Sequence, residues 1–571
     1  MMLFIETGLV LLALLLALIW PEAGAGFFSR IEVAFNRLAR RRTLSVLLVG
    51  AATLALRAAF LPIMPVPEPI VHDEFGYLLA ADTFAHGRLS NPTHPMWMHF
   101  ETFAELQQPT YQCFAPPAQG LLLAAGKVFL GHPFWGVWLS AGAMCAAICW
   151  MLQAWLPARW ALLGGLLAIL RFAVFGYWAD SYWGGALSAA AGALVLGSLP
   201  RIKRYQRPRD AIILGLGLAI LANNRPYEGV ALAVPVLFSL AAWIIGQNRP
   251  APRTFLPRVV LPLTLLFVAT LAAMGYYFWR VTGAPLRTPY QIERETYAVA
   301  PYMLWQSPRT PPAYHHAIMQ RMYVNQEFLN GYRFARTAAG FVMKSVWAWS
   351  FYLGPALTFP IFMLAFALPY GLKWGQLNPR VRFLLLASVI ALGSLALETF
   401  FHPHYAAPFT GLLIALIVFA MRTLQRWRWH GRPTGLFVVR AVPAVCAIMF
   451  VLRAVAGPLH IPLTPGYTSA WHESAPPSVG RQSLQSRLEQ LPGRQLVIVN
   501  YSSNHGPFHE WVYNAADIDN SRVVWARGMG ADKDSELLRY FHDRQIWLLE
   551  PDYNPPKLTA YPMPSEMTAT R

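Results

Sequence analysis

The chain has 571 residues, of which 56% are hydrophobic and only 13% are charged. Apolar runs of about twenty residues recur along it, which is typical of a multi-span membrane protein and excludes a soluble globular one. The net charge of +18 would suit nucleic acid, but the basic residues form short clusters between apolar runs, where they act as topology signals. We therefore expect a lipid bilayer and no nucleic acid as partner. The four cysteines show no metal-binding spacing and no disulfide framework.

The first apolar run, residues 3–20, predicts a membrane span and not a signal peptide, because no basic residue precedes it. Five arginines follow: Arg30, Arg37, Arg40, Arg41 and Arg42. Such a cluster marks the cytoplasmic side of a membrane. The N-terminus is therefore expected outside the cytoplasm, with residues 1–42 as an extra helix and basic segment. The second span, residues 44–64, returns the chain outward.

Two adjacent acids, Asp73 and Glu74, follow the second span in a predicted outer loop at residues 65–133. The whole chain has only 28 acidic residues, so a side-by-side pair near the bilayer suggests a catalytic site. The alternative is structural, because both acids open a predicted helix, where negative charge stabilises the N-terminal end. The two interpretations are compatible with each other.

Basic clusters decide the topology of the remaining helical region. If residues 116–131 do not cross the membrane, four later clusters all lie in the cytoplasm, and if they cross, all four lie outside. We therefore predict a juxtamembrane or re-entrant helix there. The further predicted spans are residues 134–155, 160–178, 184–200, 209–223, 229–246, 258–279, 348–371, 381–400, 407–424 and 434–456. This makes twelve spans in all and a membrane domain of residues 43–459, with a second long outer loop at residues 280–347.

The last part of the chain, residues 460–571, loses the apolar spans and predicts a small soluble α/β domain outside the cytoplasm. Strands are expected at residues 495–501, 521–527 and 545–550, with a helix at residues 534–543. The polar loop at residues 503–511 can reach the membrane site. Its histidines, His505 and His509, are more typical of a surface.

Four stretches of the membrane domain share features with one known family. They are Asp73-Glu74 with residues 77–82, Ala115-Pro116-Pro117 with residues 121–123, residues 221–228, and His402 to Tyr405 with Pro408. Together they resemble the GT-C membrane glycosyltransferases of the family 39 type, which includes protein O-mannosyltransferases and the lipid A aminoarabinose transferase. The likeness covers residues 43–424 and implies a GT-C-like fold.

The resemblance implies an enzyme, an inverting glycosyltransferase that moves a hexose or pentose from a polyprenyl-phosphate carrier to an acceptor hydroxyl outside the cytoplasm. The acceptor is a protein, a lipid or a glycan, and the membrane is expected to be a bacterial inner membrane. The hydroxyl must lose a proton as it attacks, and we expect Asp73 to take it as general base. Glu74 is expected to orient the acceptor or, with Asp73, to hold a divalent cation. Tyr77, in the helix after this pair, is a candidate substrate contact.

A cation is needed for the phosphate leaving group, and arginine suits it best. Where the family has a lysine before the proline pair, this chain has Cys113-Phe114-Ala115. We expect Arg225 to bind the donor phosphate instead, the alternative being an ion pair with Glu228 that stabilises the bend. Arg280, Arg287 and Arg294 are further candidates.

Glu228 is also a candidate substrate contact, and the remaining candidates are residues near predicted span ends. Trp178, Asp180 and Trp183 resemble a sugar-stacking platform with one polar anchor, although an aromatic belt at the membrane interface gives the same pattern. His402 and His404, with Tyr405, can face one way and contact a phosphate or a metal, but interface histidines are commoner.

Two other functions are compatible with the sequence. A transporter or flippase for lipid-linked sugars would place ionisable groups near the bilayer midplane within related halves, whereas here the acids gather at the outer face. A non-catalytic subunit that kept the GT-C fold would account for the missing lysine.

Overall fold

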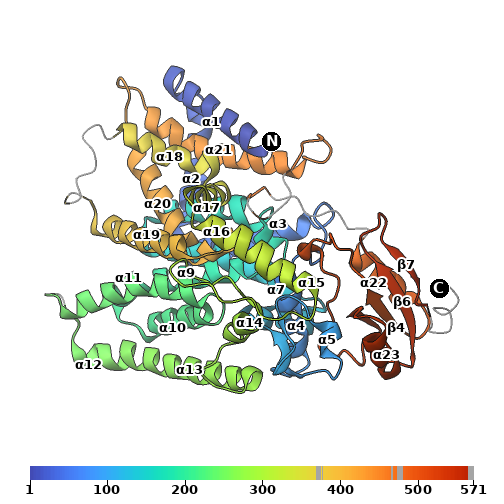
Figure 1. The fold of residues 1–571 in the computed structure, drawn as a ribbon. Helices are drawn as coiled ribbons and strands as arrows, with labels where there is room; N and C mark the ends of the chain where they lie inside the picture. The colour runs from blue at the N-terminus through green and yellow to red at the C-terminus, as the bar shows by residue number, and fades with distance from the viewer. Residues whose placement is uncertain are drawn as a thin grey trace.

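The computed structural model describes residues 1–247, 249–367, 375, 377–463, 467, 469–471 and 480–562. Most of the chain is helical, and a small sheet-containing domain forms its C-terminal part (Figure 1). Within these ranges nine helices are long and apolar enough to cross a membrane, or ten if one bent pair counts as a span. The multi-span helical class is confirmed, whereas the number of twelve spans stays a prediction.

Each of the nine long helices overlaps a predicted span. They are α1 (Met2–Ile19), α3 (Arg42–Ala59), α7 (Phe134–Trp155), α9 (Gly185–Tyr205), α11 (Pro226–Ile245), the continuous α12 to α13 segment (Pro252–Thr282), α19 (Pro379–Leu397), η6 with α20 (Pro403–Leu424) and α21 (Thr434–Ala454). Two predicted spans form shorter helices, α8 (Ala158–Ala168) with 11 residues and α10 (Pro208–Ala222) with 15. A short apolar helix, α6 (Pro117–Leu130), occupies the segment predicted not to cross.

The predicted span at residues 348–371 contains a sharp bend. The chain forms α17 (Ala338–Tyr352) and α18 (Gly354–Ala367), which meet at 97°. Gly354 has a φ of +53° at the break, and a Cβ there would lie 2.5 Å from the guanidinium of Arg171. The Glu6 carboxylate of α1 accepts the Ala356 N–H at 3.0 Å, so an N-terminal residue holds the bend. Residues 368–371 lie outside the described residues.

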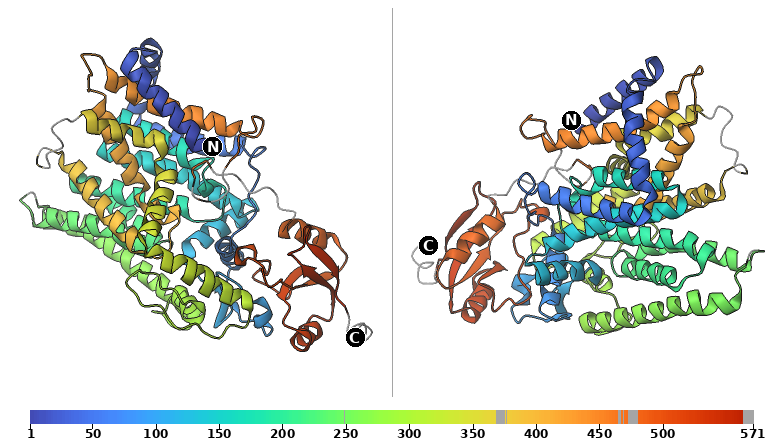
Figure 2. Two further views of the ribbon diagram at one scale, coloured as in Figure 1. Left: turned by 45° about the horizontal axis from the view of Figure 1, so that its top comes forward. Right: turned by 180° about the vertical axis from the view of Figure 1, so that it is seen from behind.

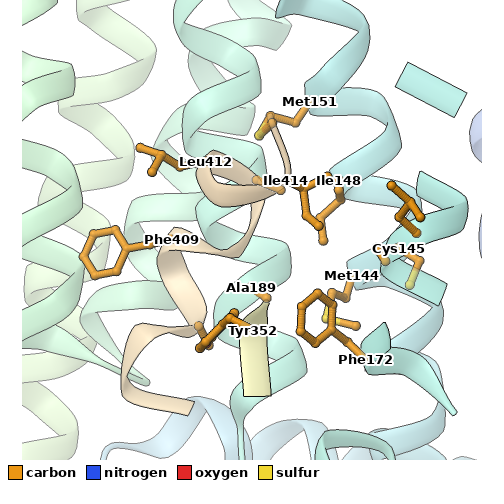
Figure 3. Packing of buried hydrophobic residues seen from close by; sticks show 14 of the residues in the cluster. Met144, Cys145, Ile148, Met151, Phe172, Ala189, Tyr352, Phe409, Leu412 and Ile414 are labelled. Carbon is orange, nitrogen blue, oxygen red and sulfur yellow. The ribbon is translucent and has the colours of Figure 1, made fainter. Parts of the chain in front are cut away.

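The core of the helical region lies between α7, α9, α20 and the segment before α20. Figure 3 shows Ile148 of α7 beside Ile414 of α20, with Met144 and Met151 of α7 in the same buried cluster. Small residues let these elements approach closely. At Gly192 of α9 an added Cβ would lie 1.9 Å from the Pro408 carbonyl oxygen. This contact positions the short 3-10 helix η6 (Pro403–Phe409), which carries part of the candidate site.

Two outer loops contain their own secondary structure. The first has α4 (His72–Ala85), α5 (Trp97–Phe100) and a small antiparallel sheet in the order β1 (Asn91–Pro92), β3 (Thr110–Cys113), β2 (Glu105–Leu106). The second has α14 (Pro289–Tyr297), α15 (Ala317–Gln320), the π-helix η4 (Arg321–Tyr332) and α16 (Arg333–Ala335). A π-helix of 12 residues is unusual, and such helices are frequent at functional sites. The arginine-rich segment between α1 and α3 forms the helix α2 (Ala25–Arg40).

The C-terminal domain has a four-stranded sheet in the order β5 (Val523–Arg527), β4 (Arg494–Val499), β6 (Arg544–Glu550), β7 (Lys557–Ala560). The first three strands are parallel and β7 is antiparallel to β6. Alternate side chains of β4 face opposite sides of the sheet. Leu496 and Ile498 pack with α23 (Ala531–Tyr540), and Val497 and Val499 pack with α22 (Arg481–Gln490).

This domain packs against the first outer loop, as both views of Figure 2 show. Phe100 and Tyr111 of the loop belong to the same apolar cluster as the β4 side chains. The rings of Phe75 and Tyr513 stack at 3.9 Å. The Asp82 carboxylate accepts the Ala516 N–H at 2.8 Å. The C-terminal domain is therefore joined to the helix that carries the acidic pair.

Candidate active site

One large cavity of about 950 Å³ opens between the two outer loops, the turn between α10 and α11, and the C-terminal domain. Its wall contains seven of the eleven residues predicted from the sequence as site residues. These are Asp73, Tyr77, Trp183, Arg225, Glu228, His402 and Tyr405. The other four, Glu74, Trp178, Asp180 and His404, lie behind the wall. Residues up to 332 positions apart in sequence thus meet at one place, since the wall joins Asp73 of α4 to Tyr405 of η6.

Asp73 occupies the first turn of α4, directly after the N-cap residue Val71 and His72. Its side chain is 27% exposed, and its carboxylate lies 3.8 Å from Nε2 of His72. A carboxylate in the first turn is favoured by the positive end of the helix dipole. The acid therefore supports the helix and faces the cavity at the same time, which is the arrangement a general base needs.

Glu74 is turned away from the cavity and is buried. Its carboxylate accepts hydrogen bonds from the backbone N–H groups of Tyr182 at 3.0 Å and Ile70 at 3.3 Å, and from the hydroxyl of Tyr467 at 3.2 Å. Burial raises the pKa of Glu74 to about 7, and these hydrogen bonds oppose the rise. We therefore correct its predicted role: Glu74 fixes the start of α4 to the loop before α9 and does not face a substrate.

The Asp73–Glu74 pair does not fit a divalent cation. N–H and O–H donors point at both oxygens of Glu74, and such donors repel a cation. In the described parts of the chain, no group of three or more His, Cys, Asp or Glu side chains is arranged to hold a metal ion. No catalytic step is therefore assigned to a metal.

Arg225 is the N-cap residue of α11 and faces the cavity with a side chain that is 13% exposed. Its guanidinium lies 4.2 Å from the centre of the Tyr405 ring and 3.8 Å from the Glu228 carboxylate. The predicted ion pair with Glu228 is thus present. At 3.8 Å it is longer than a hydrogen bond, and no hydrogen bond from this guanidinium to any described residue is found. Its donors remain available to a ligand.

Two buried arginines of the helical region use donors within the protein. Arg57 pairs with Asp180 at 3.2 Å and donates to the carbonyl oxygens of Ala179 at 3.1 Å and Met64 at 2.9 Å. Arg171 pairs with Glu6 at 3.3 Å and donates to the Ser350 carbonyl at 2.6 Å. Neither arginine lines the cavity. This contrast distinguishes Arg225 as a ligand-binding candidate.

The predicted sugar-stacking platform is divided by the fold. Asp180 is held by Arg57, and Trp178 is fully buried with its ring 5.0 Å from that of Phe351. Both are assigned to the scaffold instead of to substrate contact, because neither reaches the cavity. Trp183 does line the cavity, and its indole N–H has no hydrogen-bond partner among the described residues.

The two histidines before α20 also have different surroundings. The ring of His402 lines the cavity and lies 5.2 Å from that of Trp183. Burial lowers the pKa of His402 to about 4, so its imidazole is neutral at pH 7. His404 instead lies 2.9 Å from the Tyr177 hydroxyl, behind the wall. A shared metal or phosphate contact for the pair is therefore not supported.

The wall also contains Arg294 and residues that were not singled out by the sequence. Arg294, one of three further arginine candidates, lines the cavity, but Glu327 of η4 binds it through both guanidinium nitrogens at 3.3 and 2.9 Å. Arg280 and Arg287 are not part of the wall. Glu293 and Glu398 are buried wall residues, each with one carboxylate oxygen that has no hydrogen-bond partner in the described chain. Burial raises the pKa of Glu293 to about 7. The sequence signal for Glu293 was only its place in the long loop at residues 280–347.

The C-terminal domain contributes Phe508 and His509 to the wall. This agrees with the expectation that the loop at residues 503–511 reaches the membrane site. His505 is buried and bonds to Asp552 at 2.6 Å, so it supports the loop and does not face the cavity.

Comparison with known proteins identifies the fold. No protein-family model matches the chain, and no curated protein sequence matches it. Among solved structures, ArnT from Cupriavidus metallidurans bound to undecaprenyl phosphate is 14% identical, with a TM-score of 0.50 over 88% of this chain and 92% of that chain. The same protein in the apo state is 12% identical, with a TM-score of 0.48 over 91% and 93%. An oligosaccharyltransferase from Archaeoglobus fulgidus with a tethered acceptor peptide is 10% identical, with a TM-score of 0.48 over 89% and 68%.

The likeness to the lipid-bound ArnT structure confirms that the chain has a GT-C fold. At 14% identity it concerns the fold alone. The chemistry has to be argued from the cavity itself.

Proposed function

We propose that this GT-C-fold membrane protein is an inverting glycosyltransferase, which moves a sugar from a polyprenyl-phosphate carrier to an acceptor hydroxyl with Asp73 as general base. One observation carries the proposal. A partly exposed carboxylate and an arginine with available donors, Asp73 and Arg225, face the same cavity. These are the two charged groups that such a transfer needs.

In the proposed reaction the acceptor oxygen attacks the anomeric carbon from the side opposite the phosphate. The new C–O bond forms while the bond between the anomeric carbon and the phosphate oxygen breaks, and the electron pair stays on the phosphate. Asp73 takes the acceptor proton, which typically accelerates such a step about 10²–10⁴-fold. The products are a glycoside of inverted configuration and the polyprenyl phosphate.

Arg225 is proposed to bind the phosphate. A planar guanidinium can donate two parallel hydrogen bonds to phosphate oxygens, and Tyr405 and Glu228 hold this one in place. It would take over the part of the lysine that the family has before its proline pair, where this chain has Cys113 to Ala115. The ArnT structure with bound undecaprenyl phosphate supports a lipid phosphate as the class of carrier.

A sugar fits the unsatisfied polar groups of the wall. Trp183 supplies an unpaired N–H donor, and Glu398 supplies an unpaired carboxylate oxygen. Both are buried, and a buried polar group without a partner is unfavourable until a ligand satisfies it. A sugar hydroxyl can donate to one and accept from the other. This mixture of donors and acceptors supports a polyhydroxyl substrate.

We place the cavity on the outer face of a bacterial inner membrane, together with the N-terminus and the C-terminal domain. The support is the arrangement of basic clusters in the sequence, which the positive-inside rule assigns to the cytoplasm.

The proposal is tested by reconstituting the purified protein in liposomes with polyprenyl-phosphate hexoses and envelope acceptors. We expect loss of donor and a product of inverted anomeric configuration, detected by NMR. Arg225→Gln should abolish most of this turnover, whereas Arg280→Gln, at an exposed arginine outside the wall, should not. Movement of the donor across the bilayer without product would indicate a flippase, and no turnover with any donor would indicate a non-catalytic GT-C-fold subunit.

A further inference from the structure

We infer that the outer end of the cavity is a subsite for the ring of a carbohydrate acceptor, with Phe508 of the C-terminal domain as its apolar platform. The inference deepens the proposed function and rests on it, because an acceptor subsite presupposes transfer.

Four aromatic side chains, which we call the aromatic row, line this end of the cavity in contact with one another. They are Tyr323, Phe103, His72 and Phe508. Successive ring centres are 6.2, 5.9 and 6.0 Å apart. The row joins η4, the first outer loop and the C-terminal domain. It is therefore a surface made by tertiary structure.

Phe508 is the exposed end of the aromatic row. Its ring is large and apolar and lines the cavity, yet the residue is 48% exposed. The loop around it is fixed from two sides. Arg321 of η4 donates to the His505 carbonyl at 3.0 Å, and the His505 ring bonds to Asp552 and stacks on Tyr501 at 4.0 Å. A large apolar side chain held at a cavity mouth suggests contact with a ligand.

The chemistry around the aromatic row favours a sugar ring. Such a ring has an apolar C–H face, which suits an aromatic platform, and a rim of hydroxyl groups, which need polar partners. Two such partners border the row: Nδ1 of His72, and Oε2 of Glu293, which lies beside Tyr323. Both atoms are buried and have no hydrogen-bond partner in the described chain, and the Glu293 oxygen lies 3.7 Å from a guanidinium nitrogen of Arg294. Together they can bind the rim while Phe508 binds the face.

The position of Asp73 connects this subsite to the reaction. Asp73 follows His72 in α4, and their side chains are 3.8 Å apart. An acceptor ring on the aromatic row therefore lies next to the proposed base. Arg225, from the turn between α10 and α11, and Tyr405, from η6, line another part of the cavity wall. The donor and the acceptor would approach Asp73 from these two directions.

The subsite is tested by a binding measurement that needs no turnover. Saturation-transfer difference NMR is recorded on the full chain in nanodiscs with methyl glycosides of hexoses and N-acetylhexosamines as probes. We expect ring-proton signals that Phe508→Ala reduces at least fivefold and Phe508→Trp restores. Tyr553→Ala is the matched control, because Tyr553 is a 57% exposed aromatic residue of the same domain that does not line the cavity. Equal signals in wild type and Phe508→Ala, or no signal, would overturn the inference.

A kinetic measurement separates the subsite from the proposed function. In a protein that transfers sugar, Phe508→Ala should raise KM for the acceptor about tenfold, roughly the worth of one aromatic contact, and change KM for the donor much less. Transfer with an unaltered acceptor KM would overturn the subsite alone. Phe508-dependent glycoside binding without any consumption of donor would keep a carbohydrate subsite and overturn the glycosyltransferase proposal.

Discussion

The Glu74 carboxylate accepts the backbone N–H of Tyr182 at 3.0 Å, so one acid of the adjacent pair belongs to the scaffold while the other faces the cavity. The residues around Tyr182 continue this link. The Tyr182 carbonyl accepts from Gln119 at 2.8 Å, and the nearby Gly184 carbonyl accepts from Asn224 at 3.0 Å. The helix that carries Asp73 and the turn that carries Arg225 are therefore positioned by one hydrogen-bonded network.

Glu74→Ala should destabilise the protein. Several buried donors, among them the N–H of Tyr182, would lose their acceptor, and each such loss typically costs about 1–3 kcal/mol. We expect a clear fall in the melting temperature in detergent. A variant that keeps its melting temperature but loses turnover would contradict the scaffold role and return Glu74 to the chemistry.

The pH dependence of stability provides a separate test of Glu74. Because burial raises its pKa from 4.5 to about 7, the folded state binds this proton more tightly than the unfolded state. The contribution of Glu74 to stability is therefore greatest below pH 4.5, decreases as the pH rises toward 7, and changes little above it. The decrease is at most about 1.4 kcal/mol per pH unit.

The amide of Glu74→Gln cannot ionise. We therefore expect the melting temperature of this variant to change less between pH 5 and 7 than that of wild type, even if the variant is less stable overall. Two parallel curves would contradict the raised pKa.

The sequence predicted more of the scaffold than of the wall, and Asp73 and Glu74 show why. Successive helical residues point about 100° apart, so two adjacent acids in one helical turn meet different surroundings. The pattern identified the pair but not which member faces inward. That choice depends on Tyr182 and Tyr467, which approach from distant parts of the chain.

The same limit applies elsewhere. Asp180 resembled a polar anchor among aromatic residues until its partner Arg57, 123 positions away, was located. Glu293, Tyr323 and Phe508 had no recognisable motif, because the π-helix η4 and the packing of the C-terminal domain bring them to the cavity. By contrast, strands β4, β5 and β6 were predicted correctly, since their buried apolar runs are local signals.

The Arg57–Asp180 ion pair should contribute to stability and not to substrate binding. Removal of one partner leaves a buried charge without compensation, which typically costs about 3–5 kcal/mol. We expect Asp180→Ala to lower the melting temperature strongly. The double variant Arg57→Met with Asp180→Ala should recover part of the loss. If Asp180→Ala instead raised KM for the donor at an unchanged melting temperature, Asp180 would be a substrate contact.

Arg225→Lys should not replace arginine. A lysine ammonium lacks the planar fork and the stacking on Tyr405 that hold the guanidinium. We expect the Kd for polyprenyl phosphate, measured by microscale thermophoresis, to rise about tenfold or more, with little change in melting temperature. Arg280→Lys is the matched control. An affinity equal to wild type in Arg225→Lys would show that the phosphate binds elsewhere.

Asp73 is proposed to remove the acceptor proton. The most direct measurement is the single-turnover rate of sugar transfer with saturating polyprenyl-phosphate hexose and acceptor. It is compared between wild type and Asp73→Asn after their melting temperatures have been found equal. The amide keeps the size of the side chain but cannot accept the proton, so the account predicts a rate lower by about 10²–10⁴-fold with donor affinity nearly retained. An Asp73→Asn rate equal to that of wild type would contradict it.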